Sequence, residues 1–166
     1  MAWGGSSFLK YKDAFIRIAD NNLNMDILIR PHPLMFDHFI SSGTMTAAEV
    51  DEYKTLCKEN KNIEIDKEKE YLAAFWNSSV LACDYSSIII EYFVTSKPII
   101  YLTYGENIDY TDEMRRVLSA CYIVNDEAEL CKIIDNLKNG IDPLAEKRRV
   151  IYDEEIARCI NTSENM

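Results

Sequence analysis

The sequence predicts an α/β fold in which helices cover both faces of a parallel β-sheet. Short apolar runs alternate along the chain with longer amphipathic segments. The short runs are apolar at nearly every position, which is typical of strands buried on both faces. The composition, 48% hydrophobic and 28% charged, is that of a globular protein. At 166 residues, we expect one domain over residues 1–160 and a frayed tail over 161–166.

Capping and turn residues define the elements of the first half. Ser7 is a candidate cap for the first helix, and Pro31 ends the first strand. Thr46 and Glu49 have the spacing of a capping box. The predicted elements are, in order, a helix at 8–18, a strand at 26–30, a helix at 46–57, a strand at 62–65 and a helix at 70–76.

The second half repeats this alternation. Asp126 and Glu129 are placed to cap a helix that Asn139 and Gly140 end. The predicted elements are a strand at 80–83, a helix at 86–94, strands at 99–102 and 121–124, a helix at 126–137 and a last helix from 143 towards 159. Ligands of parallel α/β sheets bind at the carboxyl ends of the strands, so we look for functional residues there.

Charge and composition exclude several classes of function. With 28 acidic and 18 basic residues, the net charge is −10, which disfavours nonspecific binding of nucleic acid or anionic lipid. No apolar run is long enough to cross a bilayer, and the N-terminus lacks the layout of a secretory signal. The five cysteines include no Cys-x-x-Cys pair. They are expected to be buried thiols in a reducing compartment and not metal ligands.

The turn at 84–87, Asp-Tyr-Ser-Ser, follows a predicted strand and opens a predicted helix. The hydroxyls of Ser86 and Ser87 could donate to phosphate oxygens there. The alternative is that Asp84 or Ser86 only caps the helix. Glu91 lies one helical turn after Ser87, where its carboxylate could accept hydrogen bonds from a ribose. Its alternative role is that of a solvated helix residue.

The second candidate site is Arg30-Pro31-His32-Pro33, at the end of the first predicted strand. Two prolines fix the backbone around His32. The imidazole could donate to a phosphate oxygen or act as an acid, although a lone histidine is more often structural. His38 is assigned no role. Trp3 and Gly4 form a third candidate loop if a strand precedes them.

Together, these segments resemble the CDP-glycerol glycerophosphotransferase family of teichoic-acid and capsule polymerases. The resemblance is carried by Arg-Pro-His-Pro at 30–33, Asp-Tyr-Ser-Ser-Ile-Ile-Ile-Glu-Tyr at 84–92 and Lys-Pro-Ile-Ile-Tyr at 97–101. The segment 140–148 and the start at Trp3-Gly4 are similar too. The resemblance extends over nearly the whole chain.

The resemblance implies a GT-B fold, whose Rossmann-like C-terminal half binds the activated donor. The chain would be this half of a transferase that uses CDP-glycerol or a related CDP-alditol, with no metal or other cofactor. His32 would contact the donor pyrophosphate and assist departure of the leaving group. Arg30, Ser86 and Ser87 would bind phosphate together with the Trp3-Gly4 loop, and Glu91 would bind the ribose.

The same resemblance defines the expected partners and location. These are a missing N-terminal acceptor domain, which would supply the catalytic base, and a polymer acceptor. Without that domain we expect the chain to bind nucleotide weakly and to be inactive. We expect a cytoplasmic location, with the parent protein peripheral at the inner face of the cell membrane.

Two departures from the family pattern limit these expectations. The loop at 103–119 is rich in Tyr, Asp and Glu and lacks the expected Pro-Gly-Pro stretch, which leaves the donor open. If Trp3-Gly4 follows the first strand, that central strand is missing. We then expect a rearranged sheet or a strand exchanged with another copy, and a single complete sheet would contradict this hypothesis.

Two other functions fit parts of the pattern. A GT-B glycosyltransferase that uses a UDP-sugar needs the same phosphate and ribose contacts, and competition between CDP and UDP would distinguish it. A non-catalytic, flavodoxin-like domain could use an acidic surface to bind protein partners. Such domains gather acidic residues for magnesium at the end of the first strand, where this chain has Arg30 and His32.

Overall fold

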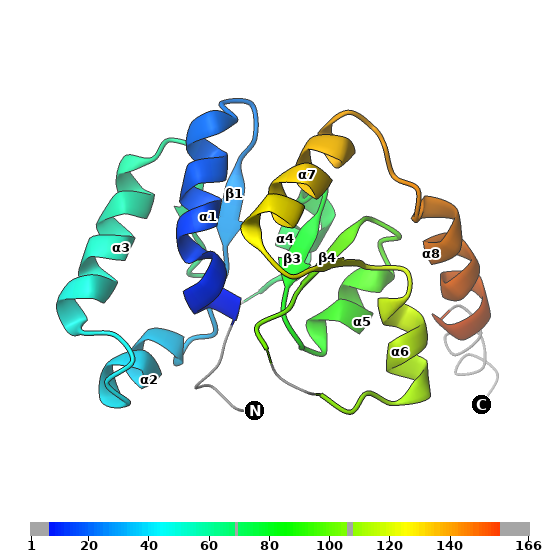
Figure 1. Cartoon of the computed structure of the whole chain (residues 1–166), viewed down its shortest axis with the longest axis horizontal. Coiled ribbons are helices and arrows are strands. Elements are labelled where there is room, and N and C mark those ends of the chain that lie inside the picture. The colour runs from blue at the N-terminus through cyan, green and yellow to red at the C-terminus, as the bar shows by residue number, and fades with distance from the viewer. Residues whose placement is uncertain (1–6, 69, 106–107, 157–166) are drawn as a thin grey trace. The chain divides into compact units, whose positions relative to one another are not determined.

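The computed structural model describes residues 7–68, 70–105 and 108–156 (Figure 1). The chain divides into two compact units, unit 1 (Met1–Tyr71) and unit 2 (Leu72–Met166). Both units contain parallel strands flanked by helices, which confirms the predicted α/β fold. The single domain over 1–160 stays a prediction. The tail at 161–166 and the candidate residues Trp3 and Gly4 lie outside the described residues.

Unit 1 is held together by packing of aromatic side chains between its helices. Its elements are α1 (Ser7–Asn21), β1 (Ile27–Ile29), α2 (Met35–Ser41), α3 (Ala47–Glu59) and β2 (Ile63–Ile65). The ring centroid of Phe8 in α1 lies 5.1 Å from that of Tyr53 in α3 and 5.8 Å from that of Phe39 in α2. β1 pairs in parallel with β2, with Ile29 opposite Ile65. The carboxyl ends of both strands therefore lie side by side.

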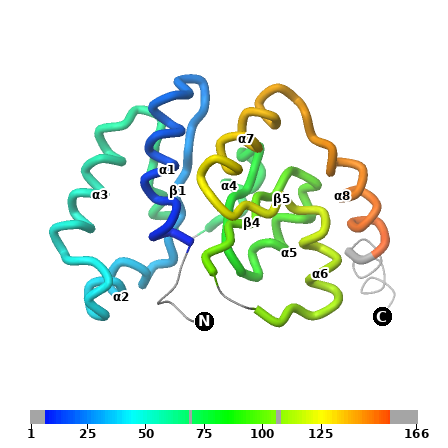
Figure 2. The backbone as a smooth tube through the Cα atoms, viewed as in Figure 1, coloured from blue at the N-terminus to red at the C-terminus, as the bar shows by residue number. Residues whose placement is uncertain are grey.

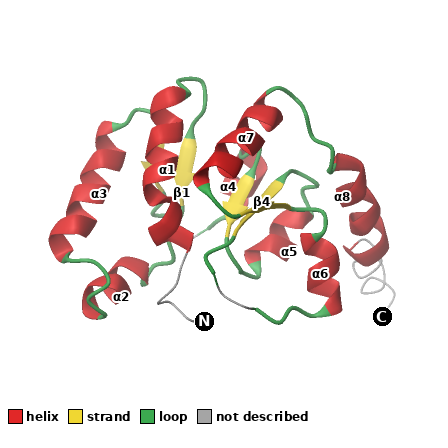
Figure 3. Ribbon diagram, in the orientation of Figure 1, coloured by secondary structure: helices red, strands yellow, loops and turns green. Residues whose placement is uncertain are grey.

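Unit 2 is built around a three-stranded parallel sheet in the order β3-β4-β5. All four residues of the middle strand β4 are buried, whereas all three residues of β3 are partly exposed. Figure 3 shows these strands among the helices of the unit, and Figure 2 follows the chain from β4 through α6 and β5 into α7. The elements of unit 2 are α4 (Leu72–Asn77), β3 (Leu81–Cys83), α5 (Ile88–Phe93), β4 (Ile99–Leu102), α6 (Asp112–Leu118), β5 (Tyr122–Val124), α7 (Glu127–Lys138), α8 (Ala145–Ile151) and a π-helical turn, η1 (Tyr152–Ile156).

Two predicted helix caps are confirmed. The Thr46 hydroxyl accepts from the Glu49 N–H at 3.2 Å, and the Glu49 carboxylate accepts from the Thr46 N–H at 2.7 Å, which completes the capping box. The Asp126 carboxylate accepts from the Glu129 N–H at 2.9 Å at the start of α7. Gly140 follows α7 with a φ of 72°, a left-handed conformation that glycine adopts readily.

Two local expectations were wrong. Ser7 is buried as the first residue of α1 and is therefore not its cap. The strand expected to be buried at 80–83 is partly exposed, because among the described strands β3 pairs with β4 alone and lies at the edge of its sheet. α8 ends at Ile151 and continues as the π-helical turn to Ile156, and the rest of the helix predicted towards Cys159 lies outside the described residues.

The strands of the described residues form the sheet β1-β2 in unit 1 and the sheet β3-β4-β5 in unit 2. The hypothesis of a missing central strand stays a prediction. Strand exchange with another copy stays a prediction.

Arg148 and Asp142 form a buried ion pair in unit 2. The Arg148 side chain is 1% exposed and the Asp142 side chain 21%. Arg148 also donates from Nε to the Ser96 carbonyl at 3.3 Å and from Nη1 to the Ala120 carbonyl at 3.4 Å. The Tyr122 hydroxyl donates to Asp142 at 2.6 Å. Ser96 and Ala120 precede β4 and β5, so this network connects α8 to the amino ends of two strands.

Asp142→Ala should destabilise unit 2 by about 3 kcal/mol, because it leaves the buried guanidinium of Arg148 without its counter-ion. Chemical denaturation measures the free energy of unfolding. As a comparison, Thr46→Ala removes only an exposed cap and should cost about 1 kcal/mol. A loss for Asp142→Ala no larger than that for Thr46→Ala would contradict a structural role of the pair.

Candidate functional site

The carboxyl ends of β1 and β2 bring Arg30 and Asp66 together. Each directly follows its strand, and the Asp66 N–H donates to the Ile29 carbonyl at 2.8 Å, which continues the ladder. Arg30 Nη1 is ion-paired with the Asp66 carboxylate. The Asp66 side chain is 8% exposed and that of Arg30 23%. The charge of Arg30 is therefore balanced within unit 1.

Arg30 also holds the loop after β2. Its Nη2 donates to the Glu68 carbonyl at 2.7 Å and its Nη1 to the Glu70 carbonyl at 3.3 Å. Asp66 accepts from the Glu68 N–H at 2.8 Å through its other carboxylate oxygen. The guanidinium carbon lies 5.8 Å from the ring centroid of Tyr71. The sequence predicted a phosphate-binding role for Arg30 and did not single out Asp66. The only signal for Asp66 was its position at the end of a predicted strand.

His32 lies in a turn two residues after Arg30, and it is exposed. Its Nδ1 accepts a hydrogen bond from the Leu34 N–H at 3.2 Å, and its carbonyl accepts from the Met35 N–H at 2.8 Å. Because Nδ1 is an acceptor in this turn, the proton of the neutral ring is on Nε2. The turn therefore orients an Nε2–H group that can donate to an anionic oxygen.

The turn at 84–87 lies at the carboxyl end of β3, as predicted. Ser86 is half-buried, and its hydroxyl accepts from the Ile88 N–H at 3.4 Å, so it takes part in the start of α5. Ser87 is exposed and makes no side-chain capping bond to α5. Glu91, in α5, is exposed despite its apolar neighbours in sequence. Burial and the nearby Asp84 raise the pKa of the Cys83 thiol, which disfavours a nucleophilic role for Cys83.

Three tyrosines gather beside this turn, and sequence reasoning did not connect them. The hydroxyls of Tyr101 and Tyr110 are 2.5 Å apart, and the ring centroid of Tyr110 lies 5.5 Å from that of Tyr85. Burial, followed by the hydrogen bond with Tyr110, raises the pKa of Tyr101, so it stays a neutral phenol. The sequence signal was the tyrosine-rich loop after β4.

The predicted site residues thus form two groups. Arg30 and His32 lie together at the carboxyl edge of unit 1. Ser86, Ser87 and Glu91 lie together at the start of α5 in unit 2. The structure describes each group within its own unit.

Comparison with known proteins identifies the family. Residues 7–157 match the family described as CDP-glycerol:poly(glycerophosphate) glycerophosphotransferase. The match includes both turns described above. No curated protein and no solved structure matches the chain.

The chain belongs to the CDP-glycerol:poly(glycerophosphate) glycerophosphotransferase family.

This family assignment confirms the resemblance found in the sequence. The glycerophosphotransferase family is one of transferases, so the match supports transferase chemistry of this type. Among residues 7–68, 70–105 and 108–156, no group of three or more His, Cys, Asp or Glu side chains is placed to hold a metal ion. No helix within those ranges is long and apolar enough to cross a membrane.

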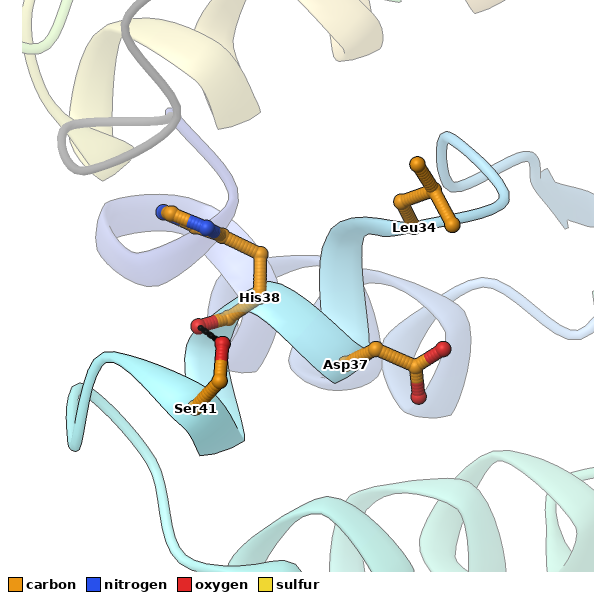
Figure 4. A pocket seen from close by; sticks show the side chains of 4 residues that line it. All are labelled: Leu34, Asp37, His38 and Ser41. Atoms are coloured by element: carbon orange, nitrogen blue, oxygen red, sulfur yellow. Dashed lines mark hydrogen bonds between the residues drawn. The ribbon is translucent and has the colours of Figure 1, made fainter.

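A shallow depression of about 370 Å³ lies on α2 and is lined by Leu34, Asp37, His38 and Ser41. Figure 4 shows the His38 ring and the Asp37 carboxylate pointing in different directions. The Ser41 hydroxyl donates to the His38 carbonyl at 3.1 Å, which is a contact within the helix. Ligand sites have polar groups that converge on one point, so we assign no function to this depression.

Asp66→Asn should destabilise unit 1 by about 2 kcal/mol, because it removes the counter-ion of a partly buried guanidinium. Arg30→Met should have an effect of similar size, whereas Asp51→Asn, at an exposed position of α3, should have little. Chemical denaturation measures the free energy of unfolding of all three variants. If Arg30→Met left the stability unchanged, the ion pair would not be what orders the loop after β2.

Proposed function

We propose that this chain binds the CDP-activated donor of a glycerophosphotransferase, CDP-glycerol or a related CDP-alditol, in the synthesis of a teichoic-acid-like or capsule polymer. The observation that carries the proposal is the family match over residues 7–157, which includes the His32 turn and the turn at 84–87. Both turns follow strands of parallel sheets, where ligands of α/β folds bind.

The reaction named by the family requires a phosphoryl transfer. An acceptor hydroxyl oxygen attacks the phosphorus that carries the glycerol, and the bond from this phosphorus to the bridging oxygen of the donor breaks. The proton of the hydroxyl goes to a base, which we expect on the acceptor domain. CMP leaves and takes the negative charge. Groups that stabilise charge on the departing phosphate therefore accelerate the reaction.

His32 is suited to this leaving-group role. Its Nδ1 accepts a hydrogen bond from the Leu34 N–H, so the proton of the neutral ring is on Nε2. In our proposal Nε2–H donates to a pyrophosphate oxygen and stabilises it as CMP departs. Arg30 already binds Asp66 and two carbonyl groups. We propose that Arg30 acts on the donor phosphates mainly by fixing the loop beside His32.

Ser86, Ser87 and Glu91 are the contacts that we propose for unit 2. The exposed Ser87 hydroxyl donates to a donor phosphate, and Ser86 assists while it also stabilises the start of α5. Glu91 accepts from the ribose hydroxyls. α5 has six residues, so the side chains contribute more to phosphate binding than the helix dipole does. The proposal includes a cytoplasmic location, with the parent protein at the inner face of the membrane.

Family membership favours CDP over the UDP-sugar alternative, because the family is described by its CDP-glycerol donor. The flavodoxin-like alternative requires acidic residues that bind magnesium at the end of β1. That position holds Arg30, which is paired with Asp66. A magnesium-dependent change in the NMR spectrum would support that alternative.

Calorimetric titration with CDP, CDP-glycerol and UDP should show selective binding of the cytidine nucleotides. His32→Ala should weaken CDP binding about tenfold, or about 1.4 kcal/mol, because it removes one hydrogen bond to a charged group. His38→Ala is the matched control, since His38 lies on α2 outside the proposed site, and it should bind CDP like the wild type. Equal affinity for UDP and CDP would favour the nucleotide-sugar alternative, and an unchanged affinity in His32→Ala would contradict the role of His32.

A further inference from the structure

Tyr85 is an exposed aromatic residue within the turn that we assign to phosphate binding. It lies between Asp84 and Ser86, at the carboxyl end of β3. The residue is 47% exposed. A single exposed aromatic residue is common on protein surfaces. The position and the support of this ring distinguish it from such residues.

The ring of Tyr85 is supported from the interior of unit 2. Its centroid lies 5.5 Å from that of Tyr110, with an angle of 57° between the ring planes. The Tyr110 hydroxyl is hydrogen-bonded to that of Tyr101 at 2.5 Å. Tyr101 is 4% exposed within β4, and its ring lies edge-on to Tyr110 at 6.3 Å. A buried strand thus fixes Tyr110, which in turn restricts the ring of Tyr85.

A restricted and partly exposed ring is suited to stacking on a nucleobase. Stacking of a base on an aromatic side chain contributes about 1–3 kcal/mol and depends little on the identity of the base. Because the ring is already held, less conformational entropy is lost when a base stacks on it. Burial and the bond with Tyr110 raise the pKa of Tyr101. The Tyr101 hydroxyl is therefore uncharged and does not repel an anionic donor.

We propose that Tyr85 is the stacking platform for the nucleobase of the donor, held in place by Tyr110 and Tyr101. The inference rests on the proposed function, since Ser86 and Ser87 in the same turn are the groups assigned to the donor phosphates. It places phosphate and base recognition in one turn after β3. Because stacking does not discriminate between bases, the preference for cytosine comes from other groups.

NMR titration of the chain with cytidine, CDP and pyrophosphate tests this inference, because NMR detects binding with millimolar affinity. Tyr85→Ala should lower the affinities for cytidine and CDP about tenfold and leave that for pyrophosphate unchanged. Tyr85→Phe should bind all three like the wild type. Trp76→Ala is the control, because Trp76 is an exposed aromatic residue on α4, 67% exposed, outside the site.

The outcomes separate this inference from the proposed function. If the wild type binds cytidine and CDP and Tyr85→Ala binds them equally well, the stacking role is wrong and the proposed function stands. An equal loss of pyrophosphate affinity in Tyr85→Ala would show a disturbed turn and would also overturn stacking. Tyr85→Leu, which keeps an apolar side chain without an aromatic ring, should behave like Tyr85→Ala. A wild-type chain that binds no nucleotide would overturn both proposals.

Discussion

The parallel pairing of β4 between β3 and β5 is the constraint on which the arrangement of unit 2 depends. β4 is buried along its whole length, and its backbone groups are satisfied by ladders on both sides. Parallel strands place all their carboxyl ends at one edge of a sheet. The turn at 84–87 and the residues after β4 and β5 therefore share an edge. Thr103 shows this directly, because its N–H donates to the Val124 carbonyl at 2.9 Å and its hydroxyl oxygen lies 3.0 Å from both that carbonyl oxygen and Asn125 Oδ1.

Within unit 2, the segments that resemble the family divide between the two edges of this sheet. The turn at 84–87 lies at the carboxyl edge, where we propose that the donor binds. Lys97 precedes β4, and its ammonium group donates to the carbonyls of Phe75, Trp76 and Ser78 at 2.6–3.1 Å. Arg148 binds the carbonyls that precede β4 and β5. Lys97 and Arg148, which belong to the resembling segments 97–101 and 140–148, thus stabilise the amino edge.

Sequence reasoning succeeded where local chemistry decides the structure. The capping box at Thr46 and Glu49, the cap at Asp126 and the strand at 99–102 each depend on residues close together in the chain, and all are confirmed. The partial exposure of β3 was missed because it depends on the order of strands in the sheet, which periodicity does not report.

The contacts within the candidate site were the hardest to predict. Arg30 and Asp66 are 36 residues apart, and only the register of β1 against β2 brings them together. Tyr85 and Tyr110 are also distant in sequence, and tertiary packing brings them together from loops after different strands. The turns themselves were predictable, because the carboxyl-edge rule needs only the strand assignments. Which side chains meet there depends on tertiary packing.

The central claim is that a cytidine nucleotide binds at the carboxyl edges of the parallel strands. Titration of the ¹⁵N-labelled chain with CDP, followed by amide chemical shifts, tests it most directly. We expect the largest shifts at Tyr85, Ser86 and Ser87 and in the His32 turn, with small shifts at Lys97 and Ala120 on the amino edge. Shifts concentrated at Lys97 and Ala120, with none at Ser86 and Ser87, would contradict the account.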